Sequence, residues 1–179
     1  MKYLMILILF TTIFCAEPIT PIPLHVTDVN TQKAKLGKKL FFDTILSKNN
    51  TVACVSCHFL NDGGDDNQKA SFGIDGQKGN INSPTVLNSR YNFVQFWDGR
   101  AKDLQDQAAG PIENPVEMGN TFPNLIKTLK NSSYKEKFAN IYKDGITKQN
   151  ITDSIAEYEK TLITPNSDLI NISEEMKMP

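Results

Sequence analysis

The five residues Cys54-Val55-Ser56-Cys57-His58 constrain this chain more than any other part of its sequence. Two thiols lie two residues apart, and an imidazole follows the second thiol directly. A redox disulfide, a tetrahedral metal site and a covalent haem site can all contain such a stretch. The rest of the sequence decides between these three interpretations.

A zinc or iron–sulfur site needs about four Cys or His ligands. The sequence has only two histidines, His58 and His25, and His25 lies in a proline-rich arm. A thioredoxin-like motif would lie within a βαβ pattern, which is not visible here. Covalent c-type haem needs only the Cys54 and Cys57 thiols and His58 as proximal iron ligand, and C-x-x-C-H is the signature of that attachment. The motif occurs once, so we predict one c-type haem per chain.

The first sixteen residues predict a secretory signal peptide. Lys2 precedes an almost wholly apolar run at residues 3–14, and Cys15-Ala16 comes before the chain turns polar. The run is short for a membrane anchor, which needs about 20 residues. Bulky Phe14 before Cys15 disfavours a lipoprotein site. We expect cleavage near Ala16, export of the mature chain, and no membrane contact afterwards. Cleavage leaves two cysteines, both in the motif, which excludes a structural disulfide framework.

Length and charge limit the remaining classes. The 179 residues suit one domain with one core. The chain has 19 basic and 20 acidic residues and a net charge of −1, so there is no electrostatic case for binding nucleic acid.

Apolar periodicity predicts a mainly α fold with long loops around haem, and no strand pattern is convincing. The first predicted helix is 28–42, with Asp28 or Thr31 as cap, and a short helix at 51–60 carries the cysteines. A third runs from Asp98 to about Ala109, where Gly110-Pro111 ends it. Three more helices follow: one with Pro123 in its first turn, one at 132–142, and a last one marked by Ile151, Ile155, Tyr158 and Leu162. The predicted organisation is signal peptide 1–16, extended arm 17–30, haem domain 31–166 and atypical tail 167–179.

Five motifs stand in order between Leu36 and Asn120: LGKKLFFD, CVSCH, NSPTVLN, FWDGRA and GPIENPVEMGN. Together they resemble the N-terminal, peroxidatic domain of bacterial di-haem cytochrome c peroxidases, and a weaker likeness continues through ITDSIAEYEKTLITPNS. The resemblance implies a cytochrome-c-like haem domain that reduces hydrogen peroxide in the periplasm of a Gram-negative cell with electrons from a small cytochrome. It also implies a second domain of this kind, whose haem receives those electrons.

The resemblance assigns roles to four further residues. Gln107 and Glu117 match the active-site glutamine and glutamate, Trp97 matches the tryptophan between the two haems, and Asn82 matches an asparagine that helps to bind calcium. Chemistry agrees, because splitting the O–O bond needs a base that moves a proton from one oxygen to the other, and a carboxylate can do this. Without these motifs the same residues would be interpreted as surface or core. Asp62, Asp65 and Asp66 lack the spacing of an EF-hand, so we expect a solvated turn there.

Two departures from the family pattern bear on function. Ile74 stands where many members have a histidine that caps the iron, so we expect an exchangeable sixth position. The second domain does not follow, and the residues after TPNS do not resemble the family's continuation, which favours truncation or a frameshift. We therefore expect reaction with peroxide, poor turnover with a reduced cytochrome, and self-association through uncovered apolar surface. The alternative hypothesis is a mono-haem electron carrier with Met118 as sixth iron ligand.

Overall fold

The computed structural model describes residues 22–165. The predicted signal peptide, the start of the arm and the tail lie outside the described residues. The described part contains five α-helices and no strand, only the isolated bridges Phe72–Lys78 and Gln95–Ala101. The helices are α1 (Thr31–Phe41), α2 (Leu104–Glu113), α3 (Phe122–Lys130), α4 (Tyr134–Ala139) and α5 (Lys148–Glu159). The prediction of a mainly α fold is confirmed.

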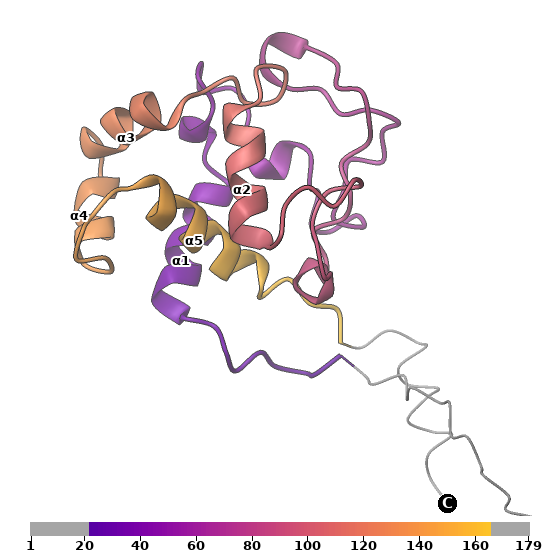
Figure 1. Ribbon diagram of the computed structural model, residues 1–179, viewed down its shortest axis with the longest axis horizontal. Coiled ribbons are helices and arrows are strands. Elements are labelled where there is room, and N and C mark those ends of the chain that lie inside the picture. Colours follow the sequence, from indigo (N-terminus) through magenta and orange to yellow (C-terminus); the bar gives the residue numbers. More distant parts are fainter. Residues whose placement is uncertain (1–21, 166–179) are drawn as a thin grey trace, which may run out of the picture.

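The pair formed by α1 and α5 is the centre of the core. Leu36, Leu40 and Phe41 are buried on α1, and Ile151 and Ile155 are buried on α5. These residues recur at helical spacing, so each helix turns one apolar stripe toward the other. Figure 1 shows α3 and α4 on one side of this pair and much of the long segment 42–103 on the other.

Close approach of α1 to α5 depends on Gly37. A Cβ atom added at Gly37 would lie 1.7 Å from the backbone oxygen of Ser154. The backbone of α5 cannot move aside as a flexible side chain would. The two helices therefore pack at a distance that only glycine permits.

Gly37→Ala should destabilise the protein. Alanine is about 0.8–1.0 kcal/mol better than glycine inside a helix, but overpacking a core costs about 1–3 kcal/mol. We expect the steric clash to outweigh the gain in helix propensity, because the obstacle is backbone. The midpoint of urea unfolding should therefore fall. Lys38→Ala, at the exposed neighbouring position, should leave the midpoint close to that of the wild type. Equal midpoints for Gly37→Ala and wild type would contradict the packing argument.

Two helix predictions in the N-terminal half of the chain were wrong. Helix α1 begins at Thr31, and its cap is Asn30, whose Oδ1 accepts from the N–H groups of Gln32 and Lys33, both at 3.1 Å. The cysteines lie on and directly after a single 3₁₀ turn, Cys54–Ser56, instead of on a helix at 51–60. Cys57 N–H bonds only three residues back, to the carbonyl oxygen of Cys54 at 3.1 Å. Phe59 N–H donates to the carbonyl oxygen of Asp65 at 3.0 Å instead of to a carbonyl four residues earlier, so no α-helix continues here.

The prediction for α2 was also wrong at both ends. Its cap is Asp103, whose Oδ1 accepts from Asp106 N–H at 2.8 Å, while Asp98 pairs with Arg100 in the preceding loop. The helix continues through Gly110-Pro111 to Glu113. Pro111 removes one donor, but its carbonyl still accepts from Met118 N–H at 3.2 Å. The proline therefore lies in the last turn without ending the helix.

The remaining helices lie close to their predicted positions. Pro123 is in the first turn of α3, as predicted, and Thr121 caps that helix. Helix α4 is shorter than 132–142, and α5 ends before Leu162.

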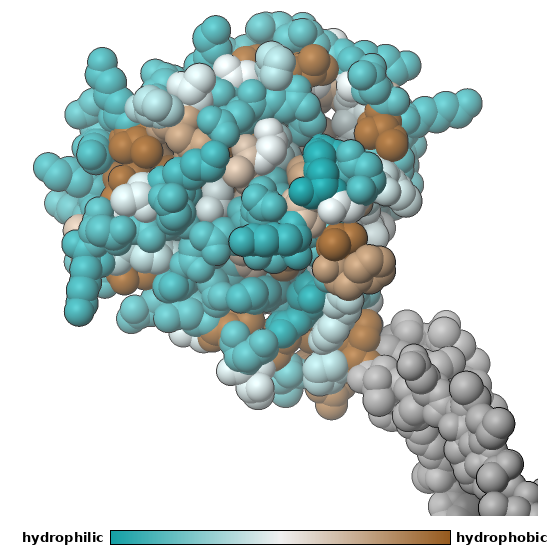
Figure 2. All heavy atoms as spheres, viewed as in Figure 1, coloured by the Kyte–Doolittle hydropathy of each residue, from teal (hydrophilic) through white to brown (hydrophobic). Residues whose placement is uncertain are grey.

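The surface of the described residues is mainly hydrophilic on the face that Figure 2 shows. Within residues 22–165 no helix has both the length and the apolar character needed to cross a membrane. Several aromatic side chains are nonetheless exposed, and Phe93 at 93% and Trp97 at 63% are the most exposed of them. Self-association through such surface stays a prediction.

Candidate functional site

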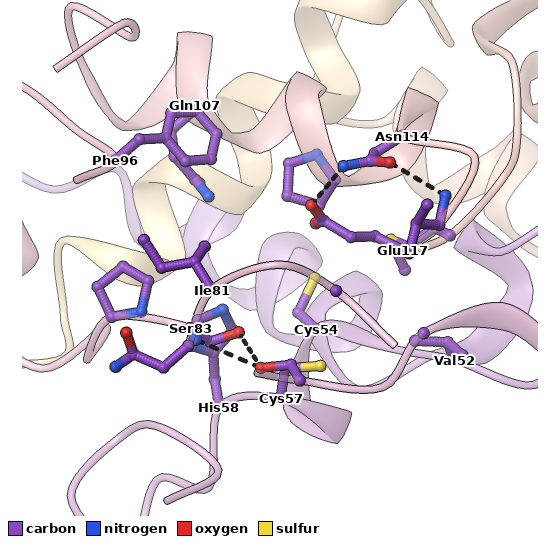
Figure 3. A pocket seen from close by; sticks show the side chains of 18 of the residues that line it. Val52, Cys54, Cys57, His58, Ile81, Ser83, Phe96, Gln107, Asn114 and Glu117 are labelled. Atoms are coloured by element: carbon purple, nitrogen blue, oxygen red, sulfur yellow. Dashed lines mark hydrogen bonds between the residues drawn. The ribbon is translucent and has the colours of Figure 1, made fainter. Parts of the chain in front are cut away.

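A cavity of about 570 Å³ brings the predicted site residues together (Figure 3). Its wall combines the cysteine turn, the loop 71–84, residues 96–100, α2 with the turn after it, and the end of α5. All the predicted residues line it: Cys54, Cys57, His58, Asn82, Trp97, Gln107 and Glu117. Met118, the ligand of the alternative hypothesis, also lines it.

His58 is oriented by a backbone contact. Its Nδ1 lies 3.2 Å from the carbonyl oxygen of Gly64, which also accepts from Val86 N–H at 3.1 Å. Only glycine fits at position 64, since φ is +77° and a Cβ would lie 2.7 Å from the side chains of Leu87 and Thr85. Nδ1 therefore carries the proton and donates it to Gly64, which leaves Nε2 as the ligating nitrogen. Burial lowers the pKa of His58 and so favours the neutral imidazole that ligation needs.

The thiols of Cys54 and Cys57 are both free and half-buried. Burial raises the pKa of each thiol, so both are neutral in this setting. Within residues 22–165 no three His, Cys, Asp or Glu side chains gather as a metal-ion ligand set. Two free thiols and one oriented, neutral imidazole on the wall of a single large cavity fit covalent c-type haem and do not fit a tetrahedral metal site.

Glu117 is held by its own turn and by the loop at 73–74. Its Oε1 accepts from Asn114 Nδ2 at 2.6 Å, and its backbone oxygen accepts from Ile74 N–H at 2.7 Å. A Cβ at Gly73 would lie 2.6 Å from Glu117 Cα, so glycine permits this approach. Burial raises the pKa of Glu117, while the Asn114 hydrogen bond and the Arg100 charge oppose that rise. The direction of the carboxyl group is thus fixed by the Asn114 hydrogen bond.

Gln107 and Trp97 lie on other parts of the wall. Gln107 projects from α2 beside Phe96, on a different side of the cavity from Glu117 and Asn114 (Figure 3). Trp97 is largely exposed, and its Nε1–H donates to the backbone oxygen of Asn82 at 3.2 Å. The indole and Asn82 are therefore linked where the cavity meets the surface.

The groups considered as sixth ligand fall in different places. Ile74 is buried, packs near Gly119, and is not among the cavity-lining residues. His25 is exposed in the arm and does not line the cavity either. Met118 is only 3% exposed and belongs to the apolar core as well as to the cavity wall.

Among the three aspartates after the motif, Asp66 departs from the solvated turn that we expected. It is buried, and its Oδ1 accepts from Gln68 N–H at 3.0 Å. Asp62 accepts from Asn67 Nδ2 at 3.1 Å. These short-range bonds close a turn, which explains why one of its acidic side chains is covered.

Sequence reasoning missed three residues of the site. Asn114 orients Glu117, and its only signal was an Asn-Pro pair that favours a turn. Arg100 lies 3.5 Å from the centre of the Phe96 ring and also acts on Glu117. Glu159 lines the cavity from α5. It could have been found, because it continues the apolar stripe of Ile151 and Ile155 at helical spacing, where a charged residue is unexpected.

Known proteins with similar sequences identify the family of this chain. The family profile "Di-haem cytochrome c peroxidase" matches residues 31–175. Cytochrome c peroxidase Ccp of Escherichia coli is 49% identical over 84% of this chain and 33% of its own length. Cytochrome c551 peroxidase of Nitrosomonas europaea is 51% identical over 84% of this chain and 46% of its own length. The chain thus spans between a third and a half of these relatives.

A solved structure supports the fold. A MauG-like protein associated with microbial copper homeostasis superposes with a TM-score of 0.77 over 93% of this chain and 51% of its own, at 22% identity. The helical architecture is therefore shared at low identity, and the sequence relatives and the profile define the family. This chain belongs to the di-haem cytochrome c peroxidase family.

Proposed function

We propose that this chain is a periplasmic c-type haem oxidoreductase that reduces hydrogen peroxide to water with electrons from a small cytochrome. The observation that carries the proposal is one cavity that joins a neutral, oriented imidazole and two free thiols to a fixed carboxyl group. When bound, a c-type haem supplies one-electron redox chemistry at its iron.

The proposed work of the protein's own groups is binding, orientation and proton movement. Cys54 and Cys57 would hold one haem through thioether bonds, and His58 Nε2 would bind its iron. The Gln107 amide hydrogen-bonds to peroxide and holds it in position in the cavity. A Glu117 carboxylate oxygen takes a proton from one peroxide oxygen and returns it to the other, which makes water the leaving group. Asn114 keeps that carboxylate in position.

Two residues whose roles are proposed from the family pattern lie where the cavity meets the surface. The exposed indole of Trp97 suits an electron relay into the site. Asn82 is proposed to contribute to a calcium site, and its backbone oxygen, which holds Trp97, would couple the two. Fast turnover with a cytochrome is proposed to need a second haem next to Trp97, since the relatives are longer than this chain.

An electron carrier is the second candidate function, because Met118 lines the same cavity. Thioether ligation raises the haem potential and suits electron transfer. Cyanide binding separates the two functions. A peroxidase site leaves one iron position exchangeable, whereas methionine ligation closes it.

We expect cyanide or azide to bind the oxidised protein without prior reduction. We also expect peroxide to change the absorbance spectrum of the protein when the two are mixed. Titration of the ferric protein with each ligand, followed by absorbance, measures this. Met118→Leu is the matched variant, since it keeps size and apolar character. Ferric protein that refuses both ligands, and binds them after Met118→Leu, would favour the carrier.

Asn114→Ala should shift the pH midpoint of the peroxide reaction to a higher pH. Glu117 must be ionised to accept a proton, and burial raises its pKa, so the rate falls as the pH drops through that pKa. Losing a hydrogen bond to a charged group costs about 1.5–3 kcal/mol, and 1.36 kcal/mol corresponds to one factor of ten. We expect about a tenfold lower rate on the acidic side and a smaller loss above the midpoint.

Stopped-flow rates measured from about pH 4 to about pH 8 test this shift, because that range brackets the ordinary pKa of a glutamate. Gln77→Ala is the control, because Gln77 Nε2 bonds the backbone oxygen of Pro115 in the same turn without touching the carboxylate. A pH midpoint shared by Asn114→Ala, Gln77→Ala and wild type would remove Asn114 from this role.

A further inference from the structure

Glu159 is a buried acid that the proposed peroxide chemistry does not use. It is the last residue of α5, is 5% exposed, and lines the cavity near Ile155. Its Oε2 is buried and has no hydrogen-bond partner within residues 22–165. An unpaired polar atom in a native core calls for an explanation, such as a group that joins the site.

Among the residues that the structure describes, nothing near Glu159 favours a negative charge. The C-terminal end of a helix carries partial negative charge, which disfavours a carboxylate there. Desolvation raises the pKa of Glu159 to about 8, and no cation in the described part opposes it. An ionised carboxyl group buried without a partner costs several kcal/mol. The side chain is therefore held close to the balance between its two protonation states.

The ionisable neighbours of Glu159 do not alter this balance. Helix α5 packs against α1 and α2. Helix α1 contributes no residue to the cavity wall, and α2 contributes only uncharged ones, Gln107, Ala108, Pro111 and Ile112. The Cys54 thiol and the Tyr158 hydroxyl are the titratable groups whose pKa Glu159 raises, and Cys54 ceases to titrate once it forms a thioether. The other ionisable groups on the wall are Cys57, His58, Lys78, Asp98, Arg100 and Glu117.

We propose that Glu159 is the redox-linked proton acceptor of the cavity. The Glu159 carboxylate takes up one proton from solvent when the iron gains one electron from a reduced cytochrome, and the acid releases that proton on reoxidation. The added electron lowers the positive charge in a cavity of low dielectric, which favours the neutral acid. This inference rests on the proposed function, because it requires the haem.

The proposal gives the cavity a second proton site besides Glu117. Reduction of one peroxide to two waters consumes two electrons and two protons. Glu117 moves a proton between the two oxygens, which supplies no net proton. Glu159 would bring in one proton with an electron, so that charge does not accumulate in the buried site.

The test is the midpoint potential of the haem-loaded chain as a function of pH. With one proton taken up per electron, the potential falls by up to about 59 mV per pH unit, the tenfold factor for a one-electron couple. We expect such a sloping region in the wild type and its loss in Glu159→Gln. Glu113→Gln, at an exposed position paired with Lys148, should keep the slope, and so should Glu117→Gln. A slope that survives Glu159→Gln, or disappears in Glu117→Gln instead, overturns the proposal.

A second measurement needs no variant. Infrared difference spectra of the wild type should gain the C=O band of a protonated carboxyl group on reduction, and that band should shift in heavy water. Absence of both the band and the slope overturns the proposal. Intact mass separates the two levels of inference, because a chain without covalent haem overturns the proposed function and this inference with it, whereas a haem-loaded chain with a flat potential overturns this inference alone.

Discussion

The double variant Cys54→Ala/Cys57→Ala should carry no covalent haem at all. The wild type should gain the mass of one haem per chain. These two thiols line the cavity, and the only other cysteine is Cys15, in the predicted signal peptide. Intact mass under denaturing conditions measures the difference, because haem held only by His58 and apolar contacts dissociates there.

Cys15→Ser is the matched control and should leave haem attachment intact, since it changes a cysteine outside the motif. Haem that stays with the denatured double variant would contradict the assignment. So would stable, folded, haem-free wild type with a reversible Cys54–Cys57 disulfide, which would revive the redox interpretation.

Glu117→Gln should slow the reaction with peroxide by about 10²–10⁴-fold, the usual contribution of a general acid–base group. The substitution keeps the size of the side chain, and Asn114 Nδ2 can still donate to the amide oxygen. What is lost is an atom that accepts and returns a proton. Stopped-flow mixing of the oxidised protein with excess peroxide at neutral pH measures the step without any electron donor.

The control for this variant is Glu113→Gln, four residues earlier, whose carboxylate pairs with Lys148 at 3.0 Å on the surface. It should react at the wild-type rate. If Glu117→Gln also did so, the carboxylate would have no part in the peroxide step. Rapid steady-state oxidation of a reduced cytochrome by the wild-type chain would separately show that no second haem is needed.

The difference between prediction and structure is clearest at the cysteines and at α2. The sequence placed Cys54 and Cys57 on a helix, but Phe59 N–H donates to the carbonyl oxygen of Asp65, and only a 3₁₀ turn forms. Gly110-Pro111 predicted a helix end, yet α2 continues to Glu113. In both cases a local propensity was overridden by a hydrogen bond or by packing that the sequence pattern does not display.

The sequence alone determined the features that depend on neighbouring residues. The attachment motif needs two thiols and an imidazole within five residues, and helical stripes need only a period of 3.6, so the haem and the mainly α fold could both be predicted. The tertiary structure decided what depends on residues far apart in the chain. It joined the Ile74 backbone to Glu117 and the end of α5 to the cavity wall. Burial is a property of the folded whole, which is why Glu159 becomes an acid without a hydrogen-bond partner in the described part only once α5 packs against α1 and α2.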